Sequence, residues 1–386
     1  MAIIGVGNIG SAHAKCIFED KIKNLKLVAL CDSSDAKLSF CKENFHGVNL
    51  YKDYNEMFLN ESLDAVIIST QHKYHVDIAI AALKNDIHIL VEKPVDITIT
   101  KAKQLNEIAA KKNKVFAVMF NQRTNPLFQK ARVIVQSGQL GELKRTNWII
   151  TNWYRTQKYY DSGDWRATWS GEGGGVLLNQ APHNLDLWQW ICGMPSSITA
   201  FCDESKFHNI QVEDDVTIFA RYKNGATGTF ITTTGEYPGT NRLEISGTYG
   251  KIIIENGILK WWKLAENERM YCFGKNYDSG NFKFDYSEIP QEDAGTAHAG
   301  IIQNFTDVIL YGGNLLSPGF EAINELTLSN AAYLSEWKGN INISLPFDSG
   351  EFDEFLNKKI SMNSDFKKDC TSNESLGYLN RWTTNW

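Results

Sequence analysis

The chain has 386 residues, of which 43% are hydrophobic and 12% aromatic, and its 39 Lys and Arg against 45 Asp and Glu give a formal net charge of −6. This much apolar material excludes a disordered chain. The mild acidity argues against a nucleic-acid partner, which would favour a basic face. At roughly 100–200 residues per domain, the length predicts two domains.

The seven Cys residues are scattered and include no Cys-x-x-Cys pair. This argues against a disulfide framework and against a zinc site, so we expect no metal. No apolar run approaches the ~20 residues that a membrane-spanning helix needs, and no secretory signal is visible. We therefore expect a cytoplasmic protein with no membrane partner.

The N-terminal third alternates short apolar strands with amphipathic helices. Strands are predicted at 2–6, 25–31, 65–69, 87–91 and 115–119, and helices at 8–18, 74–83 and 98–111. Because these strands are rich in Val, Ile and Leu on both faces, they predict a parallel sheet that helices cover on both sides. Residues 1–122 are therefore interpreted as a doubly wound α/β domain that binds a dinucleotide.

Beyond residue 122 the pattern changes to longer β runs joined by turn pairs such as Asn224-Gly225. Strands are predicted at 144–153, 216–222, 227–233, 243–246 and 252–255, and helices at 126–137, 176–191, 298–310 and 320–337. This pattern is typical of a mostly antiparallel sheet in an α+β domain. We expect residues 123–386 to form this second, substrate-binding domain, and the polar tail after Met362 to pack poorly apart from its closing aromatic residues.

A glycine-rich turn, Gly5-Val6-Gly7-Asn8-Ile9-Gly10, follows the first predicted strand and opens the first helix. The three glycines suit a tight turn, a close approach to a pyrophosphate and close helix–strand packing, and the helix N-terminus attracts the phosphate charge. Asp32 ends the second strand, where a carboxylate would bond the ribose hydroxyls, and two serines rather than Arg or Lys follow it. The motif favours NAD over NADP. The alternatives are a turn that only packs a helix and an Asp32 that only caps one.

Glu92-Lys93-Pro94 follows directly on the strand at 87–91, at the edge where open α/β sheets bind ligands. Pro94 biases Lys93 away from helical geometry, which holds the lysine at the crevice. A cation there can bond a substrate hydroxyl and favour its deprotonation. An ordinary exposed loop lysine is the alternative.

A second polar cluster lies in the helix predicted at 176–191. Asn179 and His183 are four residues apart and would share one face, with Asp186 about one turn further on. Pro182 would destabilise this helix unless the helix bends or begins there. A buried structural histidine is the alternative to a site.

Aromatic residues crowd the segment before this helix, since six of the 11 Trp residues fall between Trp148 and Trp190. Aromatic faces beside charged and amide groups suit a carbohydrate, whereas an aromatic core or a subunit interface is the alternative. The segment comprises Trp153, Tyr154, Arg155, Tyr159, Tyr160, Asp164, Trp165, Arg166 and Trp169. Glu236-Tyr237-Pro238 and His298 are further candidates for the rim of the crevice.

In order and spacing, these motifs resemble the Gfo/Idh/MocA oxidoreductases over nearly the whole chain. The resemblance rests on the first-turn glycines, Glu92-Lys93-Pro94, Arg123 with Pro126, Trp165-Arg166, and Gly173-Gly174-Gly175 followed by His183 and Asp186. It implies an N-terminal Rossmann domain and a C-terminal domain with a large open sheet. Such sheets often pair face to face, which implies a homodimer or homotetramer.

The resemblance also implies roles for individual residues. Lys93 and His183 would be catalytic, with His183 as the general base. Cofactor contacts are implied for Gly5, Gly7, Asn8, Ile9, Gly10, Asp32, Ser69, Thr70, His75, Glu92, Lys93, Gln122, Trp165 and Arg166, and substrate contacts for Lys93, Arg123, Tyr154, Asn179 and His183. The family usually has Asp where this chain has Asn179, and an amide cannot accept a proton, so Asn179 is interpreted as substrate-positioning.

Together these residues predict hydride transfer between NAD and a carbinol carbon of a sugar, glycoside or polyol. One alternative is a glycosidase-like lyase that retains NAD and releases an aglycone by transient sugar oxidation and elimination. A second alternative is a non-catalytic regulator that binds NAD.

Overall fold

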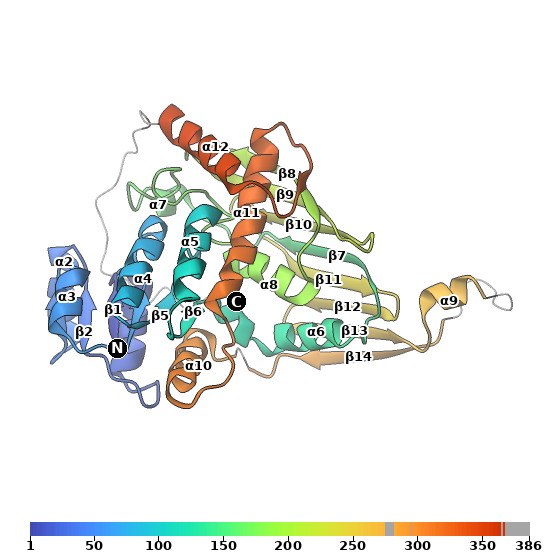
Figure 1. The fold of residues 1–386 in the computed structure, drawn as a ribbon. Coiled ribbons are helices and arrows are strands. Elements are labelled where there is room, and N and C mark those ends of the chain that lie inside the picture. The colour runs from blue at the N-terminus through green and yellow to red at the C-terminus, as the bar shows by residue number, and fades with distance from the viewer. Residues whose placement is uncertain (275–281, 294, 364–365, 367–386) are drawn as a thin grey trace.

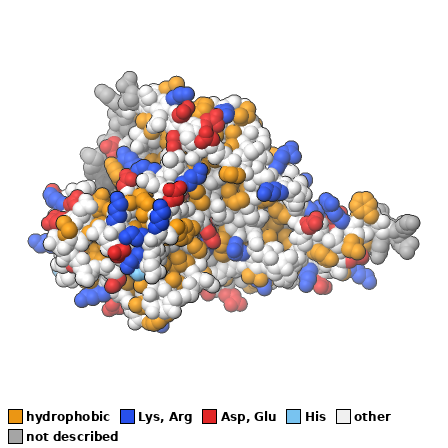
Figure 2. Space-filling view, in the orientation of Figure 1, with side chains coloured by type: hydrophobic (Ala, Val, Ile, Leu, Met, Phe, Trp, Pro, Cys, Tyr) orange, Lys and Arg blue, Asp and Glu red, His pale blue; other side chains and the backbone are white. Residues whose placement is uncertain are grey.

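The computed structural model describes residues 1–274, 282–293, 295–363 and 366, which form two sheets with helices packed around them (Figure 1). The tail expected to pack poorly lies, except for Asn363 and Phe366, outside the described residues. Within the described residues, no helix is long and apolar enough to cross a membrane. Lys and Arg side chains are mixed with Asp and Glu over the face drawn in Figure 2.

The first sheet has six strands in the order β3-β2-β1-β4-β5-β6, and all of its neighbouring strands are parallel. Its strands are β1 (Ala2–Ile4), β2 (Ala29–Cys31), β3 (Asn49–Tyr51), β4 (Ala65–Ile68), β5 (His88–Val91) and β6 (Phe116–Val118). This confirms the predicted doubly wound parallel sheet. The carboxyl ends of β1 and β4 lie at the point where the strand order reverses, which is where such sheets bind ligands.

The helices of this unit are α1 (Asn8–Phe18), α2 (Asp35–Asn44), α3 (Tyr54–Asn60), α4 (His75–Lys84) and α5 (Ile99–Ala109). The sequence did not predict α2, β3 or α3. Cys41 is the one buried residue of α2, and β3 is an edge strand with no buried residue, so neither carries a strong hydrophobic period. The starts of the two helices are instead marked by side-chain caps, because Ser34 caps α2 and Asp53 caps α3.

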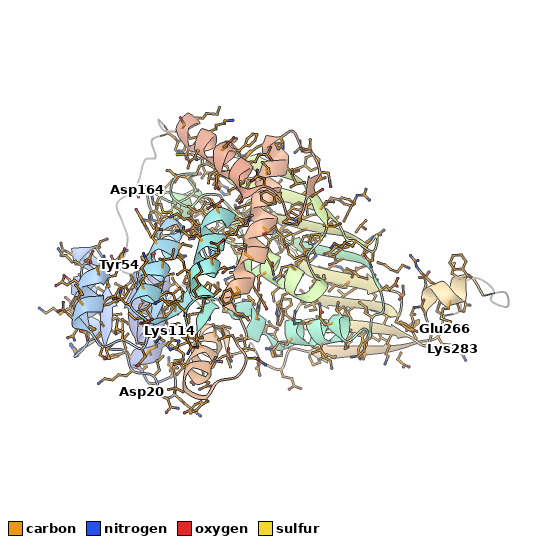
Figure 3. All side chains as sticks on the ribbon, viewed as in Figure 1. Asp20, Tyr54, Lys114, Asp164, Glu266 and Lys283 are labelled. Carbon is orange, nitrogen blue, oxygen red and sulfur yellow. The ribbon has the colours of Figure 1, made fainter. Side chains whose placement is uncertain are left out.

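The second sheet has nine strands in the order β14-β13-β12-β11-β7-β10-β9-β8-β15, antiparallel except for the pair β7 and β10. Its strands are β7 (Leu143–Ile150), β8 (Ser197–Glu204), β9 (Glu213–Arg221), β10 (Thr227–Thr233), β11 (Asn241–Gly247), β12 (Gly250–Glu255), β13 (Ile258–Leu264), β14 (Phe284–Pro290) and β15 (Ile343–Ser344). The predicted, mostly antiparallel sheet is confirmed. Glu266 and Lys283 mark the far end of its β13–β14 hairpin, beside the short helix α9 (Glu268–Cys272) (Figure 3).

Strand pairing shows that the two faces of this sheet differ. One paired row is buried throughout: Ala200, Ile218, Phe230, Trp148, Leu243, Ile254 and Leu259. The adjacent row has no buried member: Phe201, Thr217, Ile231, Ile149, Arg242, Glu255, Ile258 and Pro290. Because successive strand residues point to opposite faces, one face forms the core and the other is open.

The remaining helices are α6 (Pro126–Gln136), α7 (Gln157–Tyr160), α8 (Pro182–Cys192), α10 (Ala297–Tyr311), α11 (Ala322–Trp337) and α12 (Ser349–Met362), with 3-10 turns η1 (His72–Tyr74), η2 (Asn121–Thr124) and η3 (Gly319–Glu321). The single helix predicted at 176–191 is wrong at its start. Residues 176–181 form turns and α8 begins at Pro182, because a proline lacks the N–H that an interior position needs but fits the first helical position. Asn179 and His183 therefore do not share a helical face.

The C-terminal part of the chain returns to the first sheet. Ile301, Ile302 and Phe305 of α10 are buried in one apolar cluster with Ile3 and Leu30. This packing covers part of the first sheet with a helix that follows the second sheet in the chain. The predicted division at residue 122 thus separates the two sheets along the sequence, whereas the core of the first sheet also takes residues from beyond it.

Candidate active site

The glycine-rich turn has the shape that a dinucleotide needs. Gly5 has φ of 89°, a left-handed conformation that favours glycine. A Cβ on Gly10 would lie 1.9 Å from the carbonyl oxygen of Gly5, whereas a Cβ on Gly7 would meet only Lys37 Nζ, at 4.0 Å. The turn is therefore tightly packed on its inner side and open where a pyrophosphate would approach the start of α1. Asn8 Oδ1, in the first turn of α1, is buried without a hydrogen-bond partner among the described residues.

Asp32 follows β2 and faces this turn. Its carboxylate accepts hydrogen bonds from Val6 N at 2.9 Å and Ser34 N at 3.0 Å. Ser34, not Asp32, caps α2, so the alternative of a simple helix cap does not hold. Lys37 of α2 places its Nζ 3.7 Å from Asp32 Oδ2. Lys37 was not predicted, because only the residues directly after Asp32 were considered as partners for a phosphate. The first turn of α2 places Lys37 beside the carboxylate.

Four other expected cofactor residues, Ser69, Thr70, His75 and Gln122, follow the strands β4 and β6. Ser69 Oγ donates to the carbonyl of Gly5 at 2.7 Å, which ties β4 to the turn. The ring nitrogens of His75 lie 2.9 Å from the carbonyl oxygen of Pro94 and 3.0 Å from that of Thr70, so this buried ring joins the chain segments that leave β4 and β5. Gln122 lies half-buried in η2.

Lys93 leaves β5 at the carboxyl edge of the first sheet, and its Nζ donates to the backbone carbonyl of Asn179 at 2.7 Å. Burial lowers the pKa of Lys93, while the Glu92, Glu325 and Glu172 carboxylates act to raise it. Behind it, Glu92 Oε1 contacts His13 Nε2 at 2.7 Å. Lys93 is thus a partly buried cation at the crevice, which argues against an ordinary exposed loop lysine.

His183 is the second residue of α8, and its ring packs edge-on against Phe120 with centroids 6.4 Å apart. Burial lowers the pKa of His183 well below its ordinary value, and the charges of Lys93 and His298 lower it further. The ring is therefore neutral near pH 7 and able to accept a proton. Because Lys93 Nζ bonds the carbonyl of Asn179, four residues before His183, the two expected catalytic residues lie on neighbouring segments, although 90 residues separate them in the chain.

Glu213 of β9 anchors the turns that lead into α8. Its buried carboxylate accepts hydrogen bonds from Gly175 N at 2.8 Å, Leu177 N at 2.9 Å and Tyr333 Oη at 2.8 Å. These bonds join the segment before α8 to the second sheet and to α11. They hold Asn179 and His183 opposite the end of β5.

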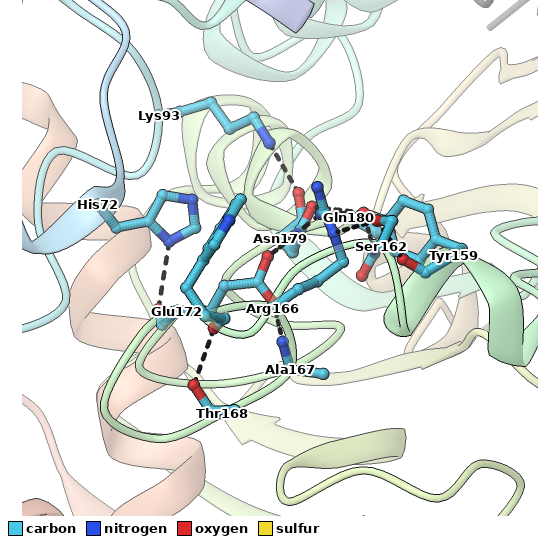
Figure 4. Close-up of polar contacts among 11 residues, drawn as sticks. His72, Lys93, Tyr159, Ser162, Arg166, Ala167, Thr168, Glu172, Asn179 and Gln180 are labelled. Carbon is cyan, nitrogen blue, oxygen red and sulfur yellow. Dashed lines mark hydrogen bonds and ion pairs between the residues drawn. The ribbon is translucent and has the colours of Figure 1, made fainter. Parts of the chain in front are cut away.

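Trp165 and Arg166 lie in a loop that docks on the end of β4. Trp165 makes an edge contact with His72, with ring centroids 6.5 Å apart, and the guanidinium of Arg166 lies 4.6 Å from the Trp165 ring centroid. Figure 4 shows Arg166 among Tyr159, Glu172, Asn179 and Gln180. Arg166 donates to Tyr159 Oη at 2.9 Å, and Gln180 Nε2 donates to the same hydroxyl at 3.2 Å.

Arg123 has different partners from the substrate that the resemblance implied. Its fully buried guanidinium donates to Asp186 at 2.6 and 2.8 Å and to Glu321 at 2.6 Å. Its flat face lies against Phe120 and Trp190. These contacts make Arg123 and Asp186 a structural ion pair between η2 and α8. Arg123 is therefore not part of the proposed substrate site.

The aromatic segment divides between core and surface. Trp153, Tyr160 and Trp169 are buried, so for them the aromatic core was the right interpretation. Tyr154 is 46% exposed and stacks edge-on with Tyr237, at 5.7 Å between centroids. Tyr154 also lines a cavity of about 320 Å³, together with Arg155, Thr156, Gln157, Phe207, His208 and Gly235.

Several residues of the site were not predicted. His13 and Glu325 reach Lys93 and its neighbours only through the fold, and no local signal marks them. Glu172 did carry a signal, since it is the one charged residue in the run Gly171–Gly175. Its side chain lies at the centre of the contacts in Figure 4.

Comparisons with known proteins agree with this geometry. Residues 1–120 match the model of an oxidoreductase family with an NAD-binding Rossmann fold, and residues 128–253 match the GFO/IDH/MocA C-terminal domain. The chain is 25% identical to myo-inositol 2-dehydrogenase of Thermotoga maritima over 66% of this chain and 75% of that protein. It is 29% identical to D-glucoside 3-dehydrogenase of Escherichia coli over 51% of this chain and 54% of that protein.

A solved structure has the same fold. The WlbA dehydrogenase of Chromobacterium violaceum, in complex with NADH and UDP-GlcNAcA, aligns with a TM-score of 0.77 and 26% identity over 90% of this chain and 96% of that chain. The two family models together cover most of the chain, and the N-terminal one describes an NAD-binding Rossmann fold. The chain therefore belongs to the GFO/IDH/MocA family of oxidoreductases.

Proposed function

We propose that this protein is a dehydrogenase that transfers a hydride between NAD and a carbinol carbon of a sugar, glycoside or polyol. The observation that carries the proposal is the convergence of Lys93, from the end of β5, and His183, from the start of α8, on the crevice at the carboxyl edge of the first sheet. The names of the inositol and glucoside dehydrogenases to which the chain is similar support this substrate class.

The two side chains supply the two functions that oxidation of an alcohol requires. Neutral His183 would take the proton of the reacting hydroxyl, and its lowered pKa keeps it available for this down to mildly acidic pH. Lys93 would donate a hydrogen bond to the same oxygen and so favour loss of that proton. The bound nicotinamide supplies the hydride chemistry, for which the open turn at Gly7 and the carboxylate of Asp32 would hold the cofactor.

The wall of the substrate site is proposed at the cavity beside Tyr154. Arg155 belongs to this cavity and also acts to lower the pKa of Lys93, which supports placing the cavity on the substrate side of Lys93. The exposed rings of Tyr154, Phe207 and Tyr237 offer apolar faces to a sugar ring, and the guanidinium of Arg155 can bond hydroxyls. This arrangement supports a carbohydrate or cyclitol as the substrate.

The test is a panel of sugars, cyclitols and glycosides, each assayed with NAD and with NADP for formation of the reduced cofactor. We expect turnover with at least one polyhydroxylated substrate, and a fall in kcat of at least about 100-fold in Lys93→Met and His183→Gln, the scale of general acid–base catalysis. Lys84→Met and His46→Gln, at exposed positions, are the matched controls and should leave kcat unchanged.

Two results would contradict the proposal. Release of an aglycone without net NADH would favour the NAD-retaining lyase, and NAD binding with no turnover of any substrate would favour the regulator. The comparisons give no support to either alternative, because the relatives with assigned activities are named as dehydrogenases.

A further inference from the structure

Glu172 is a buried carboxylate inside the glycine-rich segment that precedes α8. Its side chain is 1% exposed. Oε2 accepts from the backbone N–H of Ala167 at 2.5 Å, and Oε1 accepts from the side-chain amide of Asn179 and lies 3.5 Å from the guanidinium of Arg166 (Figure 4). These donors fix the orientation of the Glu172 carboxylate.

Asn179 connects Glu172 to Lys93. Its side-chain amide donates to Glu172, and its backbone carbonyl accepts from Lys93 Nζ at 2.7 Å. The carbonyl that positions the ammonium therefore belongs to a residue whose side chain is fixed by Glu172. The main chain of Glu172 is fixed in turn, because its carbonyl oxygen lies 3.2 Å from His72 Nδ1 of the first unit.

The charge balance around Lys93 gives Glu172 a second role. The direct partner of the ammonium is a neutral carbonyl, and Asn179 contributes no charge. Glu92 already faces His13, and both carboxyl oxygens of Glu325 are buried without a hydrogen-bond partner among the described residues. Burial raises the pKa of Glu325 well above its ordinary value, whereas the pKa of Glu92 is lowered to about 2. Glu172 is the carboxylate on the Asn179 side of Lys93, and like Glu92 it acts to raise the pKa of Lys93.

We propose that Glu172 is a positioning residue for the reaction: through Asn179 it fixes the carbonyl that holds Lys93, and it supplies the negative charge that an amide at position 179 lacks. The proposal rests on the function proposed above for Lys93. It concerns a group that touches neither substrate nor nicotinamide and acts through a neighbour.

The proposal is tested by exchanging the carboxylate at position 172 and the amide at position 179. Glu172→Gln removes the charge with almost no change of shape, and Asn179→Asp alone sets two carboxylates against each other. The double variant E172Q/N179D moves the charge to position 179 and keeps the hydrogen bond with its donor reversed. We expect each single variant to lose about 10- to 100-fold in kcat/KM, the usual loss when a residue that orients a reacting group is removed, and the double variant to recover most of that loss.

The second readout needs no substrate. In protein labelled with [ε-13C]lysine, the signal absent from Lys93→Arg identifies Lys93, and its pH titration gives the pKa of the ammonium. Glu92, Glu325, Glu172, Arg155, His183, His72 and His298 face or influence this group, and all but Glu172 stay unchanged in E172Q. Because a nearby carboxylate favours the charged ammonium, the pKa of Lys93 should fall in E172Q and return in E172Q/N179D. The basic limb of the pH profile of kcat/KM should move to lower pH in E172Q.

Three outcomes would overturn the proposal: an unchanged Lys93 titration in E172Q, a double variant no better than either single variant, or an equal loss in Glu107→Gln, an exposed control.

If E172Q does not fold, the double variant decides. A folded double variant with the wild-type Lys93 titration supports the proposal, and a double variant that is unfolded or has a lowered Lys93 pKa refutes it. Failure of the substrate panel would leave the titration result standing, so the two proposals fail separately.

Discussion

Asp32 and Lys37 lie 3.7 Å apart at the edge of the nucleotide turn, where the 2′ position of the adenosine ribose would be read. The carboxylate suits ribose hydroxyls and repels a 2′-phosphate, whereas the ammonium attracts one. The preference for NAD that we expect would therefore depend on Asp32 outweighing a cation that is already in place.

From this pair we predict a change of cofactor preference in Asp32→Ala. Without the carboxylate, Lys37 is free to pair with a 2′-phosphate, and a charge-assisted hydrogen bond of about 1.5–3 kcal/mol corresponds to about 10- to 100-fold. The ratio of Kd for NADP to Kd for NAD, measured by fluorescence titration, should fall by this factor. Asp35→Ala removes a nearby exposed carboxylate and should leave the ratio unchanged. An unchanged ratio in Asp32→Ala would show that Lys37 does not read the ribose.

At the scale of elements, the start of α8 decides how the site is assembled. The hydrophobic pattern of residues 176–191 continues smoothly through Pro182, which is why the sequence predicted one helix. Glu213 instead bonds the backbone N–H groups of Gly175 and Leu177, so the chain turns before the helix and begins it at the proline. Asn179 consequently faces Lys93 from a turn, and His183 faces the crevice from the first turn of α8.

Pro182→Ala distinguishes these two arrangements. At the first helical position, proline mainly restricts the unfolded chain, so its replacement should destabilise the fold by about 0.4–1 kcal/mol. In a helix interior, removal of the proline would instead stabilise the fold by about 3 kcal/mol. Urea unfolding followed by tryptophan fluorescence measures the difference. A variant more stable than the wild type would contradict the observed start of α8.

At the scale of the whole molecule, the open face of the nine-stranded sheet carries partly exposed side chains on most of its strands. Ile149 and Ile231 are paired across β7 and β10 near the middle of this face, and both are only half-buried. Phe201 and Tyr286 stand 54% and 46% exposed on its outer strands β8 and β14. We propose that this face pairs with the same face of a second copy, since a self-complementary surface suits two-fold assembly.

Ile149→Lys tests this association. A charge at the centre of an apolar interface has no partner there. The free energy needed to bury it exceeds the free energy that the apolar contact contributes. We expect the wild type to elute as a dimer or a larger assembly in size exclusion with light scattering, and Ile149→Lys to shift to the monomer mass. Val133→Lys, which adds the same charge at an exposed position of α6, should keep the wild-type mass. A wild-type monomer at micromolar concentration would rule the association out.

The sequence by itself determined the features that depend on local pattern. The five predicted strands of the first sheet, the turn Gly5–Gly10 and the placement of Lys93 after β5 follow from hydrophobic period and chain order. The structure has a strand within each predicted range, whereas the edge strand β3 was not predicted. Asn224-Gly225 likewise marked the turn between β9 and β10. Such features need only neighbours in the chain, so a single sequence carries enough information to find them.

Only the tertiary structure decided which distant charges meet. It made Arg123, an expected substrate contact, the partner of Asp186, and it joined Glu172 to Lys93 through Asn179. Each pairing joins side chains from separate elements, or from one element and the loop beside it. Their strength comes from burial, which no local pattern records, and burial is settled when the two sheets and the returning helices α10 and α11 pack together.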